Sequence, residues 1–68
     1  MITYEALTVG KRYRVKVVEP SSIITFIGRL NVKIMAYTEE PRLYRLVFDC
    51  AEVDYTEDTT INFEELNN

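Results

Sequence analysis

The sequence predicts a small all-β domain in which a short helical turn precedes five strands that close into a barrel. Apolar and charged residues alternate with a period of two over most of the chain, which is typical of strands with one buried face. Turn-forming residues separate the alternating segments. A chain of 68 residues is long enough for one hydrophobic core only, so residues 1–68 are predicted to form a single small β-barrel domain.

The chain begins with a predicted helical turn and a basic strand. Thr3 is placed to cap a brief helix that continues to Leu7. Residues 11–19 then alternate as a half-buried strand. Its apolar face is formed by Tyr13, Val15 and Val17. Its basic face is formed by Arg12, Arg14 and Lys16.

A long second strand is predicted for residues 23–38. Its even positions from Phe26 to Ala36 form an apolar row, so Val32 and Ile34 are expected to face the core. Gly28 interrupts this row, and a glycine inside a strand often marks a bulge or a bend. We therefore expect this strand to bend there and to take part in two sheets.

Three shorter strands complete the predicted barrel. The third has an apolar row from Tyr44 to Cys50, so the Cys50 thiol is expected to be buried. The apolar phase then slips at Ala51, which predicts a turn or a bulge because a strand cannot otherwise change its buried face. A fourth strand follows through Tyr55, and a fifth covers Ile61 and Phe63, with a helical turn possible over residues 63–66.

Two short motifs resemble known barrel families. The segment Phe26-Ile27-Gly28-Arg29-Leu30 resembles the hydrophobic-x-Gly-x-Leu element of Sm-like proteins. Residues 7–15 are similar to the start of SH3-like barrels, in which a glycine precedes the first strand, and residues 60–66 are similar to the closing strand of either family. The resemblance implies a small barrel that tends to form rings or dimers. Sm proteins that bind uridine-rich RNA carry an aspartate and then an asparagine a few residues beyond the Gly-x-Leu. Residues 31–37 contain no acidic residue and no asparagine after Asn31, so that site is not carried over.

The composition argues against an enzyme. The chain contains one cysteine and no histidine, which excludes a Ser-His or Cys-His pair within it. Asp54, Glu57 and Asp58 lack the glycine and the spacing of a calcium loop. We therefore predict no catalytic residue, no metal and no cofactor. The single cysteine favours the cytoplasm, and no apolar segment is long enough to cross a membrane.

Charge is divided along the chain. All eight lysines and arginines lie within residues 1–45, whereas residues 46–68 contain seven of the eleven acidic residues and no base. Three interpretations remain open. The two charges could pair across the barrel surface, they could join subunits head to tail, or the carboxylates could imitate the phosphates of a nucleic acid.

The candidate binding residues form two charged sets. The basic set, which could contact phosphates with Tyr37 as a stacking surface, contains Arg12, Arg14, Lys16, Arg29 and Lys33. The acidic set, which could meet a basic partner, contains Asp49, Glu52, Asp54, Glu57 and Asp58. Either set could equally be a solvated surface.

A surplus of apolar residues predicts a contact surface. Ile23, Ile27, Met35 and Tyr37 alternate with the predicted core row, and exposed apolar patches usually mark interfaces. The sequence therefore predicts a non-enzymatic protein-binding module that forms a homo-oligomer or binds a protein partner. A phage or mobile-element inhibitor of a host protein is one setting for so small an acidic chain. The alternative is nucleic-acid or nucleotide binding through residues 12–16 and 29–33.

Overall fold

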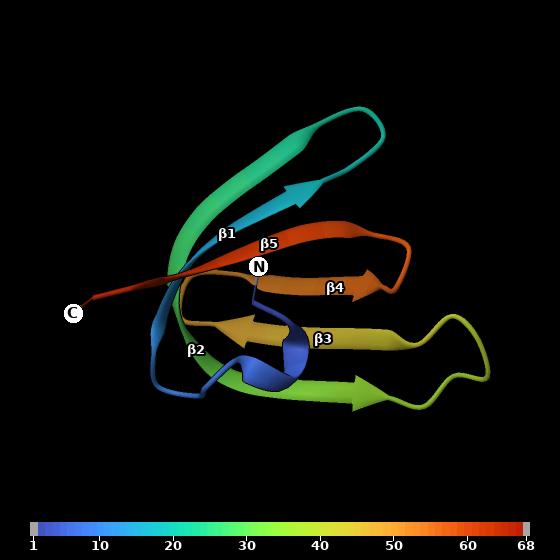
Figure 1. Ribbon diagram of the computed structural model, residues 1–68, viewed down its shortest axis with the longest axis horizontal. Helices are drawn as coiled ribbons and strands as arrows, with labels where there is room; N and C mark the ends of the chain where they lie inside the picture. The colour runs from blue at the N-terminus through green and yellow to red at the C-terminus, as the bar shows by residue number, and fades with distance from the viewer. Residues whose placement is uncertain (1, 68) are drawn as a thin grey trace.

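The structure is a computed structural model that describes residues 2–67. A single 3-10 turn, η1, precedes five β-strands (Figure 1). Their bounds are η1 Tyr4–Ala6, β1 Arg12–Val18, β2 Ile23–Ala36, β3 Leu43–Phe48, β4 Glu52–Thr56 and β5 Thr60–Leu66. The all-β class and the five strands predicted from alternation are thereby confirmed.

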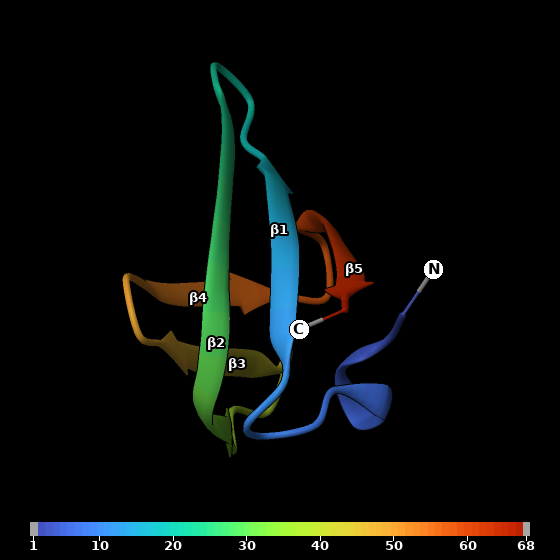
Figure 2. The same cartoon turned by 90° about the vertical axis from the view of Figure 1, so that its left-hand side faces the viewer.

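The strands form one antiparallel sheet in the order β4-β3-β2-β1-β5. The first half of β2 pairs with β1, from Val18 opposite Ile23 to Arg12 opposite Arg29. The second half pairs with β3. Figure 2 shows the result, with β1 and β2 crossing over β3 and β4. The second strand was expected to take part in two sheets; in the structure it pairs with β1 along its first half and with β3 along its second half within one sheet.

The irregularity in β2 lies beyond Gly28. Pairing of β2 with β3 shifts register between Leu30 and Val32, so Asn31 is the additional residue of a bulge. Gly28 remains in regular pairing opposite Tyr13. Glycine here allows the end of β3 and the turn after it to approach β2 closely, since an added Cβ would lie 2.9 Å from the Sγ atom of Cys50 and 3.1 Å from the Cβ atom of Phe48.

The bulge reverses the faces of the second half of β2. Val32 pairs with Val47 on the outer face, whereas Lys33 pairs with the fully buried Leu46, and cross-strand partners share a face. The prediction that Val32 and Ile34 face the core is therefore wrong, and their side chains are 44% and 45% exposed. An extra residue in a strand changes the side on which every later residue lies.

The core lies inside the curve of the sheet. Its buried side chains are Leu7, Tyr13, Val15, Val17, Leu30, Leu46, Phe48, Val53, Tyr55 and Phe63. The predicted barrel closure does not form, because β4 and β5 are the two edges of the sheet and are not hydrogen-bonded to each other. Side chains bridge this gap instead. The ring centres of Tyr55 on β4 and Phe63 on β5 are 6.2 Å apart.

The remaining local predictions are confirmed in part. The helical turn forms at the predicted place, but the Thr3 side chain makes no capping hydrogen bond. The strand β5 continues to Leu66, so the proposed helical turn at residues 63–66 is wrong. Cys50 is exposed, not buried, because β3 ends at Phe48 and the cysteine lies in the turn before β4. No helix within residues 2–67 has the length and hydropathy needed to cross a bilayer.

Candidate functional site

The basic residues of β1 lie on the outer face of the sheet, as predicted. Arg14 forms an ion pair of 2.8 Å with Glu64 on the neighbouring β5. Lys16 is exposed and Arg12 is half-buried, and within residues 2–67 neither forms an ion pair. Only part of this basic face is therefore open to an anionic ligand.

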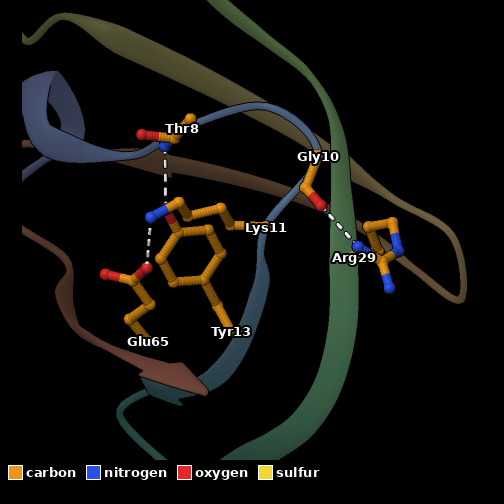
Figure 3. Close-up of polar contacts among 6 residues, drawn as sticks. All are labelled: Thr8, Gly10, Lys11, Tyr13, Arg29 and Glu65. Carbon is orange, nitrogen blue, oxygen red and sulfur yellow. Dashed lines mark hydrogen bonds and ion pairs between the residues drawn. The ribbon is translucent and has the colours of Figure 1, made fainter. Parts of the chain in front are cut away.

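Polar contacts hold the start of β1 in place (Figure 3). The Thr8 amide donates to the hydroxyl of the buried Tyr13 at 2.8 Å. Lys11 pairs with Glu65 at 2.7 Å, and this carboxylate holds the pKa of Lys11 above its ordinary value. The Arg29 guanidinium donates to the Gly10 carbonyl, which ties β2 to the segment that precedes β1.

Lys33 does not lie with the other basic residues. It is on the inner face, where its Nζ atom donates to the Leu7 carbonyl at 2.7 Å and approaches the carbonyls of Tyr4 and Glu5. Its ammonium also lies 5.2 Å from the centre of the Tyr4 ring, a distance typical of cation–π contact. Lys33 therefore holds η1 against the sheet. Tyr37 follows the half of β2 that pairs with β3 and is not brought beside the basic strand.

Two of the predicted acidic residues have arginine partners. Asp54 on β4 accepts two hydrogen bonds from Arg45 on β3, at 2.8 and 3.1 Å. Hydrogen bonding from this guanidinium lowers the pKa of Asp54. Glu57 lies 3.8 Å from Arg42. Together with the ion pairs that Lys11 and Arg14 form with β5, these contacts join the basic and acidic parts of the chain, so charge pairing across the surface is observed at four places.

The other acidic residues of the predicted set differ in their surroundings. Asp49 accepts a hydrogen bond from the Arg29 amide at 2.9 Å and donates its own amide to the Arg29 carbonyl, so it attaches the turn between β3 and β4 to β2. Glu52 and Asp58 are exposed, and neither forms an ion pair within the described residues. Among the residues that the structure describes, no three acidic or thiol groups gather as a metal site.

An aliphatic stripe runs along the outer face of β2. We define it as Ile23, Ile27, Val32 and Ile34, which are 61%, 44%, 44% and 45% exposed. The sequence predicted Ile23 and Ile27 as interface residues, but Val32 and Ile34 were missed because the bulge was not located. Met35, the third predicted interface residue, lies opposite Tyr44 on the inner face and is not part of the stripe.

A hollow lies on the inner side, between the hairpin of β1 and β2 and the edge strand β4. We call it the hairpin hollow; its volume is about 190 Å³. Its apolar floor consists of Val17, Ile24, Phe26 and Val53, and its rim includes Glu19, Glu52 and Asp54. Ile24 was not singled out from the sequence, and the structure shows this side chain on the inner face opposite Val17 and 51% exposed.

A second hollow is lined by aromatic rings. Tyr4, Tyr44, Tyr55 and Phe63 lie along it, and its volume is about 250 Å³. The rings of Tyr44 and Tyr55 stack with their centres 5.0 Å apart. Burial raises the pKa of Tyr55 well above that of an ordinary phenol, and the neighbouring Tyr44, Tyr4 and Glu5 add to this effect. These rings are the packing that fills the open side of the sheet.

Comparison of the chain with protein-family models, with curated proteins and with solved structures finds no match.

Proposed function

We propose that the protein is a non-enzymatic binding module that acts through protein–protein contacts made by the aliphatic stripe. The observation that supports this proposal is the exposure of four branched aliphatic side chains along the outer face of a central strand, with Thr25 and Arg29 between them on that face. Exposed apolar rows of this kind are costly in water and usually mark a surface that another protein covers. For the family we propose a relation to SH3-like or Sm-like proteins, which is supported by the hydrophobic-x-Gly-x-Leu segment at residues 26–30.

A second copy of the chain is the partner that suits this face best. A two-fold contact is self-complementary, because the same patch of one copy lies against that patch of the other. The exposed side chains of the stripe are aliphatic, so the stripes of two copies would cover each other without a complementary charged surface.

The oligomeric state tests this proposal. We expect multi-angle light scattering to show a dimer whose dissociation constant changes little between 50 and 500 mM salt, because apolar contacts are not screened. The double variant Ile27→Thr/Ile34→Thr keeps β-branched side chains in the strand and is expected to be monomeric. Val9→Thr is the matched control, since Val9 is 52% exposed outside the stripe.

Two results would count against the proposal. A strict monomer at millimolar concentration would exclude self-association through the stripe. A dimer that dissociates at high salt but still forms in the Ile27→Thr/Ile34→Thr variant would show that charged residues, and not the stripe, make the contact. As the biological setting we propose a cytoplasmic inhibitor of a host protein, encoded by a phage or mobile element, which is supported only by the small size and acidic composition of the chain.

A further inference from the structure

We infer that the hairpin hollow binds a basic segment of a partner protein, which inserts one apolar side chain between β4 and the hairpin of β1 and β2. The inference deepens the proposed function by naming the chemistry of a partner. It rests on the proposed function only in that both describe a protein-binding module. The surface is a different one, because the hollow does not include the aliphatic stripe. The two proposals can therefore fail separately.

The shape of the hollow sets the size of the ligand group. Ligand sites for small molecules usually have volumes of roughly 300–1,000 Å³, whereas the hairpin hollow has about 190 Å³. A hollow of this size accommodates one side chain of a partner, as anchor pockets in protein interfaces do. Val17 and Val53 form a floor that is almost fully buried, at 5% and 9% exposure.

Ile24 shows that this apolar surface lacks a cover within the described chain. It pairs with the buried Val17, so it lies on the inner face of the sheet, yet 51% of its surface is exposed. The tip of the hairpin extends beyond β3 and β4 in Figure 2, and the exposure of Ile24 indicates that the described residues do not cover its inner face at this end. An inserted apolar group would remove Ile24 from water.

The charge around the hollow selects the rest of the ligand. Glu19 and Glu52 line it, and within residues 2–67 neither forms an ion pair. Glu19 also lines an adjoining hollow with Asp58, which extends the acidic rim towards β5. No lysine or arginine lines either hollow. Asp54, which also lines the hollow, is paired with Arg45. The charge that is left to a ligand comes from Glu19 and Glu52, and it is complementary to lysine or arginine beside an apolar residue.

A peptide titration followed by methyl NMR tests the inference. The probe is a capped seven-residue peptide in which four lysines surround one phenylalanine, and two analogues replace the phenylalanine by serine or the lysines by glutamate. We expect the first peptide to shift the methyl signals of Val17, Ile24 and Val53 and to leave those of Ile27 and Ile34 unchanged. The serine analogue is expected to bind about tenfold more weakly because the apolar contact is lost, and the glutamate analogue is expected not to bind.

Matched variants distinguish binding at the hollow from attraction of the peptide by the net charge of the protein. The change Glu19→Gln/Glu52→Gln is expected to weaken binding about fivefold, as the loss of two exposed charge contacts would do. The control Glu39→Gln/Glu40→Gln removes the same charge from the exposed loop between β2 and β3 and should leave affinity unchanged. Ile24→Thr is expected to weaken binding, and Val9→Thr is its control. An unchanged pattern of amide signals verifies that each variant is folded.

Several results would overturn the inference. Equal weakening by the two glutamine pairs would show that net charge alone attracts the peptide. Equal affinity of the serine analogue would exclude an apolar anchor. Absence of shifts at Val17, Ile24 and Val53 with millimolar peptide would exclude the hollow as a site, while the oligomeric state would still decide the role of the aliphatic stripe.

Discussion

At the scale of the residue, Gly28 lies where the turn between β3 and β4 approaches the middle of β2. A Cβ atom at this position would meet the Cys50 Sγ atom at 2.9 Å, the Asp49 Oδ1 atom at 3.0 Å and the Phe48 Cβ atom at 3.1 Å. The same turn is attached there by a hydrogen bond from the Cys50 thiol to the Ile27 carbonyl, at 3.2 Å. Glycine at position 28 therefore permits the contact through which the two halves of the sheet meet.

The first prediction follows from this contact. We expect Gly28→Ala to lower the free energy of unfolding by about 1–3 kcal/mol, the usual cost of adding a methyl group where there is no room. The measurement is urea unfolding followed by circular dichroism. Adding Cys50→Ala removes the nearest atom and should recover part of the loss. A Gly28→Ala protein as stable as the parent would show that the turn moves away freely.

A second prediction at this scale concerns Tyr55, whose pKa is raised by burial. An unfolded tyrosine ionises near pH 10, whereas the folded protein keeps this hydroxyl protonated to higher pH. The unfolded state therefore releases a proton first, and stability falls as pH rises above about 10, by up to about 1.4 kcal/mol per pH unit. Urea unfolding between pH 9 and pH 11.5 measures this slope.

The variant Tyr55→Phe should have a smaller slope than the parent, because its ring cannot ionise in either state. Tyr37→Phe is the matched control, since Tyr37 is 95% exposed and should leave the slope unchanged. Equal slopes for the parent and for Tyr55→Phe would contradict the raised pKa.

At the scale of the element, β2 shows how far alternation can be read from sequence. The faces of β1 and β4 were predicted correctly, because each is a short strand with regular pairing. In β2 the prediction was correct from Phe26 to Leu30 and failed from Val32 onwards. The bulge at Asn31 arises because β2 changes partner from β1 to β3, and no local pattern in residues 23–36 records where that change occurs.

The same bulge explains which parts of the candidate surfaces could be predicted. Ile23 and Ile27 precede it, so their outward position followed from alternation alone. Val32 and Ile34 follow it and were assigned to the core. Lys33 was assigned to the basic outer face for the same reason, although the bulge turns it towards η1. The alternating pattern thus locates a surface only up to the first irregularity of the strand.

The third prediction concerns the attachment of η1 by Lys33. The change Lys33→Met keeps an unbranched side chain that is one atom shorter and removes the hydrogen bonds to the carbonyl groups of Tyr4 and Leu7. We expect a loss of about 1–2 kcal/mol in the free energy of unfolding, with faster hydrogen exchange at the Ala6 and Leu7 amides. Lys16→Met is the control, because Lys16 is exposed on the outer face, and should change stability by no more than about 0.5 kcal/mol. Equal effects of the two changes would contradict an anchoring role for Lys33.

At the scale of the whole molecule, the order of the strands redistributes the charge that is divided along the sequence. The basic β1 lies beside the acidic β5, and the arginines next to and within β3 lie beside β4 and its turn. Exposed ion pairs of this kind stabilise a protein only weakly, but each one occupies a cation that could otherwise contact a phosphate. The strand order cannot be read from composition, and for this reason the sequence alone left pairing, self-association and anion binding open.

The fourth prediction separates protein binding from the alternative of nucleic-acid binding. On the outer face the exposed Lys16 and the half-buried Arg12 form no ion pair within residues 2–67, and the protein carries a net charge of −3. Non-specific binders of nucleic acid typically have dissociation constants of about 10⁻⁴–10⁻⁶ M at physiological salt. We expect fluorescence anisotropy with a labelled 20-nucleotide single strand to show weaker binding than about 10⁻⁴ M in 150 mM salt.

At low salt, two phosphate contacts limit the slope of log affinity against log salt to about −1.4. The contrary result is tight binding with a steeper slope. If that binding is lost in Arg12→Gln/Lys16→Gln and retained in Ile27→Thr/Ile34→Thr, the outer face binds nucleic acid.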